Sequence, residues 1–89
     1  MTQPEAPKIE FPCHYPIKVI GDSDEGFEAF VTEVAQRHDP HLDTERVTVN
    51  PSRNGRFISI RLRIWATGEA QLQGLFLELK QDDRVHMVL

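Results

Sequence analysis

Hydrophobic and polar residues alternate along the chain with two different periods, which predict four strands and two helices. The clearest alternation lies in residues 56–67, RFISIRLRIWAT, where Ile or Leu occupies every second position. A strand with this pattern presents one apolar face to a core. Its other face would carry Phe57, Ser59, Arg61, Arg63 and Trp65.

Three further segments alternate in the same way and are predicted to be strands. In the last of them, Met87 is predicted to face the core and Val88 to face away from it. Asn54 and Gly55 precede the strand at 56–67 and are a strong signal for a tight turn, so a hairpin is expected there. The three segments are residues 15–21 (YPIKVIG), 45–51 (ERVTVNP) and 85–89 (VHMVL).

Two segments repeat apolar residues at spacings of three and four, which is typical of helices with one buried face. The first follows the acidic turn GDSDEG and is expected to end near residues 37–38, before Pro40. The polar residues 22–24 are candidates to cap its N-terminus, and Thr67 is a candidate to cap the second helix. The apolar positions are Phe27, Phe30, Val31, Val34 and Ala35 in the first helix and Leu72, Leu75, Phe76 and Leu79 in the second.

The predicted order is therefore strand, helix, strand, strand, helix, strand. Two helices packed on one face of a four-stranded antiparallel sheet would bury every apolar stripe, so the fold class is α+β with a ferredoxin-like arrangement. Residues 11–89 would form this single domain, and residues 1–10 would be a flexible tail. The first and third strands would be central, and the other face of the sheet would stay open.

Composition indicates an ordinary globular protein, since 39% of the 89 residues are hydrophobic and 27% are charged. One cysteine, Cys13, excludes an intrachain disulfide framework. No apolar run is long enough to span a membrane, and the N-terminus lacks the pattern of a signal peptide. We therefore expect a cytoplasmic protein that does not engage membranes.

Charge is distributed unevenly along the chain. The net charge is −4, but residues 1–45 hold three Lys or Arg against ten Asp or Glu, and residues 46–89 hold seven against four. If folding separates the two halves of the sequence, one surface becomes basic enough to attract an anion although the whole molecule is acidic.

Several strings together resemble the YbeD-like family of small bacterial proteins. They are FPCHYPIKVIG, VAQRHDP, PSRNGRFISIRLRIWAT and VHMVL, and they occur in order over residues 10–89. The resemblance implies a ferredoxin-like domain similar to the ACT regulatory modules of metabolic enzymes, with no established activity. In ACT-like modules the loop after the first strand helps to bind small amino acids, and here that loop would contain Gly21, Asp22 and Ser23.

Catalysis and metal binding are not expected from these residues. Cys13 and His14 are adjacent and would point to opposite sides of an extended chain, so they form no nucleophile and base pair. His38 and His41 have a spacing that one helical face could share, but Pro40 lies between them. We therefore predict a protein that is not an enzyme and holds no metal or cofactor.

The open face of the sheet leaves three interpretations. Arg, Trp and Phe are enriched at protein interfaces, so a protein partner or self-association is one, and a solvated face that binds nothing is another. Single-stranded RNA is the less favoured alternative, since the net charge is negative and the neighbouring central strand offers only Lys18 and Ile20 on the open face. A small-molecule ligand remains possible through the ACT-like loop. The predicted partner face consists of Lys18, Ile20, Phe57, Arg61, Arg63, Trp65 and His86.

Overall fold

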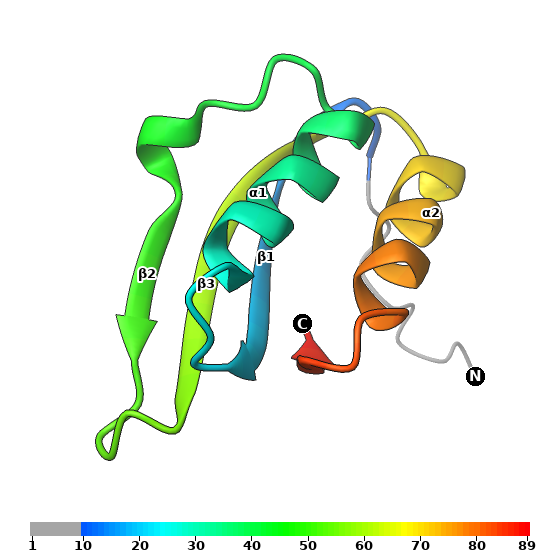
Figure 1. Cartoon of the computed structure of the whole chain (residues 1–89). Coiled ribbons are helices and arrows are strands. Elements are labelled where there is room, and N and C mark those ends of the chain that lie inside the picture. Colours follow the sequence, from blue (N-terminus) through cyan, green and yellow to red (C-terminus); the bar gives the residue numbers. More distant parts are fainter. Residues whose placement is uncertain (1–9) are drawn as a thin grey trace, which may run out of the picture.

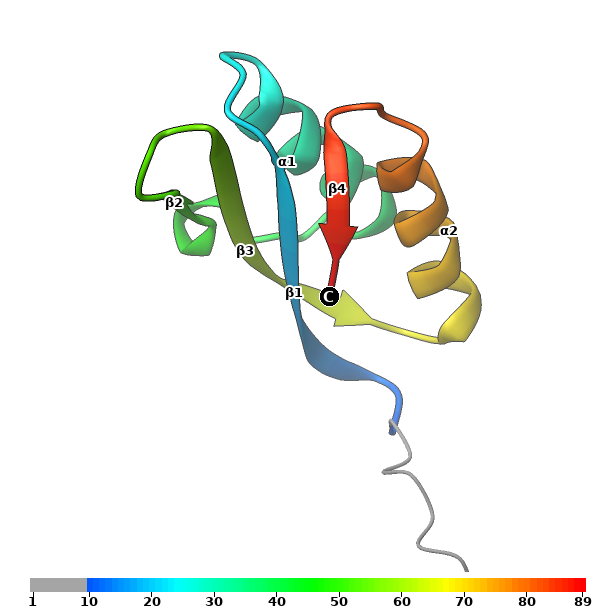
Figure 2. The same ribbon diagram turned by 90° about the horizontal axis from the view of Figure 1, so that it is seen from below.

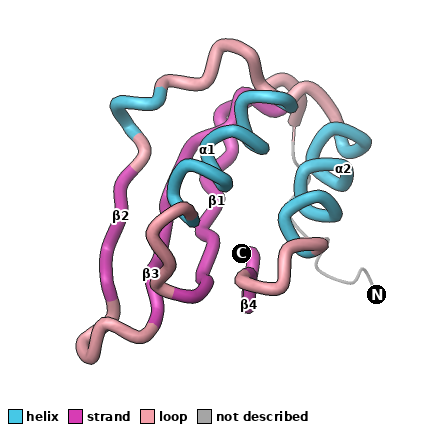
Figure 3. The backbone as a smooth tube through the Cα atoms, viewed as in Figure 1, coloured by secondary structure: helices cyan, strands magenta, loops and turns pink. Residues whose placement is uncertain are grey.

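A computed structural model describes residues 10–89 of the chain. The predicted tail at residues 1–10 lies outside the described residues except for Glu10. Figures 1 and 3 show the order of the elements, which alternate as the sequence predicts. The elements are β1 (Cys13–Asp22), α1 (Phe27–His38), a short 3-10 helix (Thr44–Arg46), β2 (Thr48–Pro51), β3 (Phe57–Ala66), α2 (Glu69–Lys80) and β4 (Val85–Val88).

The four strands form one antiparallel sheet in the order β2-β3-β1-β4. β1 and β3 are central and pair over their full lengths, from Cys13 opposite Ala66 to Asp22 opposite Phe57. Both helices lie on the same side of the sheet, as Figure 2 shows from below. The ferredoxin-like fold predicted from the two periods is confirmed.

The core lies between the helices and the covered face of the sheet. Each apolar stripe predicted from the sequence contributes to it, because the three-four spacing keeps these residues on one side of a helix. Burying such side chains is the main favourable term in folding a chain of this size. The largest fully buried side chains are Phe27, Ile60, Ile64, Leu75, Leu79, Val19, Val31 and Val34.

The orientation predicted for β4 is wrong. Val88 pairs with Val19 and packs against the core, whereas Met87 pairs with Ile20 and is 49% exposed on the open face. The register between β1 and β4 shifts directly after Ile20. A bulge of this kind places two consecutive residues on one face, so His86 and Met87 both lie on the open side.

The predicted helix caps are also wrong. α1 begins after Gly26 and α2 begins after Gly68, and neither cap residue uses a side chain. The polar residues 22–24 therefore do not cap α1 through their side chains. Thr67 lies one residue too early and instead donates from its backbone N–H and its hydroxyl to the Gln71 side-chain oxygen, at 2.6 and 3.2 Å.

β2 is short and leaves half of its neighbour unpaired on that side. It pairs with β3 only from Pro51 opposite Ile58 to Thr48 opposite Arg61. The connection between α1 and β2 runs along the remaining edge of β3 (Figure 1). Asp39 in this connection accepts a 3.0 Å hydrogen bond from the backbone N–H of Trp65, which gives that exposed strand edge a partner.

Candidate functional site

Basic side chains gather at the middle of the open face. Lys18 of β1 lies opposite Arg61 of β3, and Pro16 lies opposite Arg63, so these side chains share one face of the sheet. Arg46 joins them from the 3-10 helix, and the four cations line a shallow depression of about 510 Å³. Among residues 10–89, no carboxylate forms an ion pair with Lys18, Arg61 or Arg63. This depression therefore presents positive charge to the solvent.

One end of the open face is engaged within the molecule. His86 Nε2 lies 2.6 Å from Asp22 Oδ1, and the His86 ring packs edge-on against Phe57 with 5.3 Å between ring centroids. Ile20 and Met87 lie beside them on the same face. This end combines an apolar surface with a histidine and carboxylate pair, and it adds no free cation to the basic depression.

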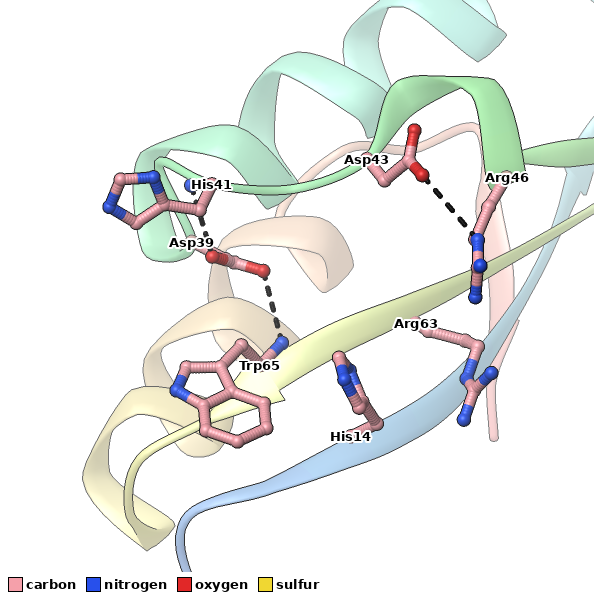
Figure 4. Close-up of a pocket in the computed structure, with 7 residues that line it drawn as sticks. All are labelled: His14, Asp39, His41, Asp43, Arg46, Arg63 and Trp65. Carbon is pink, nitrogen blue, oxygen red and sulfur yellow. Dashed lines mark hydrogen bonds and ion pairs between the residues drawn. The ribbon is translucent and has the colours of Figure 1, made fainter.

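The other end of the open face carries the single tryptophan. Trp65 is 42% exposed and lies opposite His14, with 4.8 Å between the two ring centroids and an edge-on geometry. Their rings form one wall of a cavity of about 250 Å³ between β1, β3 and the α1–β2 connection. Figure 4 shows Arg63 beside His14, and Arg46 opposite it on the 3-10 helix.

Two carboxylates lie at the edge of this cavity, and both are already used. Asp39 is only 5% exposed, and its two oxygens accept the backbone N–H groups of Trp65, at 3.0 Å, and of His41, at 3.2 Å. Asp43 accepts the backbone N–H of Glu45 and lies 3.4 Å from the Arg46 guanidinium (Figure 4). Of the two arginines at the cavity, Arg46 is therefore paired with Asp43, and Arg63 has no ion-pair partner among residues 10–89.

The sequence did not indicate this cavity. Arg63 and Trp65 were predicted on the open face, but His14, Asp39 and His41 were not linked to them. Two of those three lie between regular elements, where no period predicts which way a side chain points. The one available signal was the polar connection HDPHLDTER, whose length and charge exceed what a simple link between helix and strand requires.

The two histidines with helical spacing do not meet. His38 Nε2 lies 2.9 Å from Glu78 Oε1 and ties α1 to α2, whereas His41 lies at the cavity. Over residues 10–89, no three His, Cys, Asp or Glu side chains come together as a metal site requires.

The loop predicted to bind a small ligand is occupied by the protein's own groups. Gly21 is buried against the Phe27 ring, Asp22 pairs with His86, and the Ser23 N–H donates to the backbone carbonyl just before β3 at 3.1 Å. These contacts hold β1, β3, β4 and α1 together. The cavity with Trp65 lies at the opposite end of β1 and β3.

Comparison with known proteins places the chain in a family. A family model described as "Protein of unknown function (DUF493)" matches residues 6–89. A UPF0250 protein of Azotobacter vinelandii is 57% identical over 89 residues, covering 99% of this chain and 97% of the relative. The chain therefore belongs to the DUF493 family, as its resemblance to YbeD-like proteins implies.

Solved structures with low sequence identity share the fold. Protein HP0495 from H. pylori has a TM-score of 0.72 at 20% identity, over 100% of this chain and 97% of that one. The ACT domain from GTP pyrophosphokinase of Chlorobium tepidum has a TM-score of 0.67 at 20% identity, over 86% of this chain and 97% of that one.

The described helices, in residues 10–89, are all too short or too polar to cross a membrane.

Proposed function

We propose that this DUF493 protein is a cytoplasmic, non-enzymatic regulatory module that binds an acidic segment of a partner protein on the open face of its sheet. One observation carries the proposal: Lys18, Arg61 and Arg63 lie together on that face with no carboxylate in ion-pair contact among residues 10–89. Unpaired cations side by side repel each other, and a carboxylate-rich partner relieves this repulsion. The fold shared with an ACT domain supports a regulatory role by analogy.

The chemistry of the face favours carboxylates on a protein. A guanidinium group binds a carboxylate through two parallel hydrogen bonds. Arg61 and Arg63 carry two such groups, two residues apart on the same face of β3. The exposed side chains of Trp65 and Met87 flank the basic depression and offer apolar contact. Face-to-face association of two copies would bring like charges together, so we favour a different protein as partner over a homodimer on this face.

The arrangement of the aromatic residues favours protein over single-stranded RNA. Phe57 and Trp65 lie eight residues apart on β3, which corresponds to about 27 Å in an extended strand. Phe57 is also covered at its edge by His86. Successive bases stack on neighbouring rings, and these two rings are too far apart to hold adjacent bases.

The non-enzymatic part of the proposal rests on where the reactive groups lie. The two histidine and carboxylate pairs, His38 with Glu78 and His86 with Asp22, join separate elements of the fold. Cys13 is half-buried at the start of β1 and packs against the core. These groups are explained by packing and by contacts between elements.

Fluorescence anisotropy with a labelled peptide of alternating glutamate and leucine tests the proposed function. We expect binding at low salt that weakens as salt screens the charges. Arg61→Gln and Arg63→Gln should each weaken it about tenfold, as expected for the loss of one charge-assisted hydrogen bond. Arg53→Gln in the exposed hairpin turn is the matched control and should bind as the wild type does.

Two outcomes would count against this function. Equal affinity of the wild type and both β3 variants would show that the basic depression is not the docking site. Tight binding of oligo-uridylate without binding of the acidic peptide would favour the RNA alternative.

A further inference from the structure

The cavity beside Trp65 has the size of a site for a small metabolite. Its volume of about 250 Å³ is below the roughly 300–1,000 Å³ of sites for drug-sized ligands and far above the roughly 30 Å³ of one water. It is bounded on three sides, by β1, by β3 and by the α1–β2 connection (Figure 4). It lies beyond Thr48, the first residue of β2, where the edge of β3 that faces away from β1 has no strand partner.

Arg63 is the guanidinium group at this cavity that is left for a ligand. Both oxygens of Asp39 accept backbone N–H groups, and Asp43 is occupied by Glu45 and Arg46. Arg63 forms no ion pair with any carboxylate of residues 10–89. A ligand that satisfies its donors must carry acceptor atoms, and a carboxylate matches the planar guanidinium of Arg63.

The wall opposite the 3-10 helix is aromatic. The rings of His14 and Trp65 pack edge-on with 4.8 Å between centroids, and Trp65, which lines the cavity, is 42% exposed. Exposed aromatic rings favour contact with other planar rings. From the ring wall and the adjacent guanidinium together, we propose that this cavity binds a small aromatic carboxylate.

The proposal of a ligand site does not rest on the proposed function, although the cavity and the partner surface share side chains. Arg46 and Arg63 line both the cavity and the basic depression. The ligand's ring would lie against Trp65, and its carboxylate would bind the guanidinium group of Arg63. Binding of a small carboxylate therefore does not require that a protein partner exists.

The single tryptophan makes the test direct. In ¹⁵N-labelled full-length protein, the Trp65 indole N–H gives one resonance, and its position is followed during titration with benzoate. We expect a saturable shift with a dissociation constant on the order of 1 mM, as for a ligand of so few atoms. Benzamide has the same shape without the charge and should cause no saturable shift. Inorganic phosphate tests for a site that accepts any anion.

Two variants test whether the shift of the Trp65 resonance comes from binding in the cavity. Arg63→Gln should weaken benzoate binding about tenfold, by the same loss of a charge-assisted hydrogen bond. Arg53→Gln removes an equal charge from the hairpin turn and should leave binding unchanged. Both positions are exposed, and the backbone amide spectrum verifies that each variant is folded.

Four results would overturn the proposal. These are no saturable shift with benzoate, an equal shift with benzamide, unchanged affinity in Arg63→Gln, and phosphate binding as tight as benzoate. The last of these would show a general anion site without recognition of an aromatic ring.

Discussion

Gly21 shows how one missing side chain permits the packing of β1 against α1. A Cβ atom at this position would lie 2.6 Å from the backbone oxygen of Arg84 and would overlap the Phe27 ring. Gly21→Ala should lower the free energy of unfolding by about 1–3 kcal/mol, the usual cost of overpacking a core. Urea denaturation measures this change.

Gly68→Ala is the matched control, because a Cβ there meets no atom within 4 Å. It should change the free energy of unfolding by less than about 1 kcal/mol, because the preference of an N-cap for glycine over alanine is opposed by the restriction that alanine places on the unfolded chain. Equal denaturation midpoints for the two variants would contradict the close approach at Gly21.

Asp39 is the residue on which the wall of the cavity depends. Its carboxylate accepts the backbone N–H groups of Trp65 and His41 and is nearly buried. Asp39→Ala leaves both donors without this partner, so the free energy of unfolding should fall by about 1–3 kcal/mol. Asp39→Asn should cost less, because its amide keeps one acceptor oxygen.

The control for this prediction is Glu45→Ala, which removes an exposed carboxylate from the 3-10 helix of the same connection. Removing a solvated carboxylate usually changes stability by less than about 0.5 kcal/mol. If both alanine variants unfold at the same urea concentration, Asp39 does not hold the α1–β2 connection to β3.

At the scale of single residues, the sequence predicted where a side chain points when the period of a strand or helix sets its direction. It did not predict the direction of side chains in loops or at a bulge. Alternation placed Arg61, Arg63 and Trp65 on the open face, because neighbouring residues of a strand point to opposite sides. The same rule failed for Met87, since a bulge in the β1–β4 register is invisible in the pattern of β4. Asp39 was missed because loop geometry directs its side chain and periodicity does not.

At the scale of elements, one arginine joins two turns at the end of the sheet opposite the cavity. Arg84, in the α2–β4 turn, donates to Asp82 at 2.8 and 2.9 Å and to Asp24 of the β1–α1 loop at 3.0 Å. Its guanidinium also lies 5.5 and 5.1 Å from the ring centroids of Phe27 and Phe30. These contacts hold the start of α1 against the end of α2.

The contact between Arg84 and Asp82 in this turn predicts that the free energy of unfolding depends on pH in the acid range. The hydrogen bonds from Arg84 lower the pKa of Asp82 from 3.8 to about 2. Because the pKa is lower in the folded protein, the stabilisation is complete above about pH 4 and is lost as the pH falls through about 2. Urea denaturation over this acid range should show a smaller loss of stability for Arg84→Gln than for the wild type.

Lys80→Gln is the control for the acid series, because it removes a positive charge from the exposed end of α2 without touching Asp82. It should lose stability over the acid range as the wild type does. If Arg84→Gln also follows the wild type, the pair between Arg84 and Asp82 contributes nothing to the folded state.

The sequence predicted elements better than their ends. Each helix and strand was expected because its apolar residues repeat with the right period, and the core confirms both helical stripes. The N-caps Gly26 and Gly68 were missed, because neither offers the side-chain oxygen by which a cap is recognised. The late start of β2, at Thr48, was missed because alternation already begins at residues 45–47, where the 3-10 helix ends.

At the scale of the whole molecule, folding brings part of the uneven charge of the chain to one place. Arg46, Arg61 and Arg63 come from the basic half of the sequence and meet Lys18 from the acidic half on the open face. A molecule with a net charge of −4 thus presents a basic depression to a partner. The same arginines reach the neighbouring cavity, so the two proposed sites are not independent in their energetics.

Because both proposed sites use Arg46 and Arg63, we predict that the small ligand weakens binding of the partner. A carboxylate held by Arg63 neutralises a charge that the acidic peptide would otherwise contact. Saturating benzoate should therefore weaken binding of the labelled glutamate and leucine peptide about five- to tenfold, and by linkage the peptide should weaken benzoate by the same factor. Anisotropy measures the first effect and the Trp65 indole resonance measures the second.

Benzamide at equal concentration should leave the peptide affinity unchanged. If the Trp65 resonance shows the cavity filled with benzoate while the peptide binds as before, the two sites are not coupled, and the arginines serve only one of them.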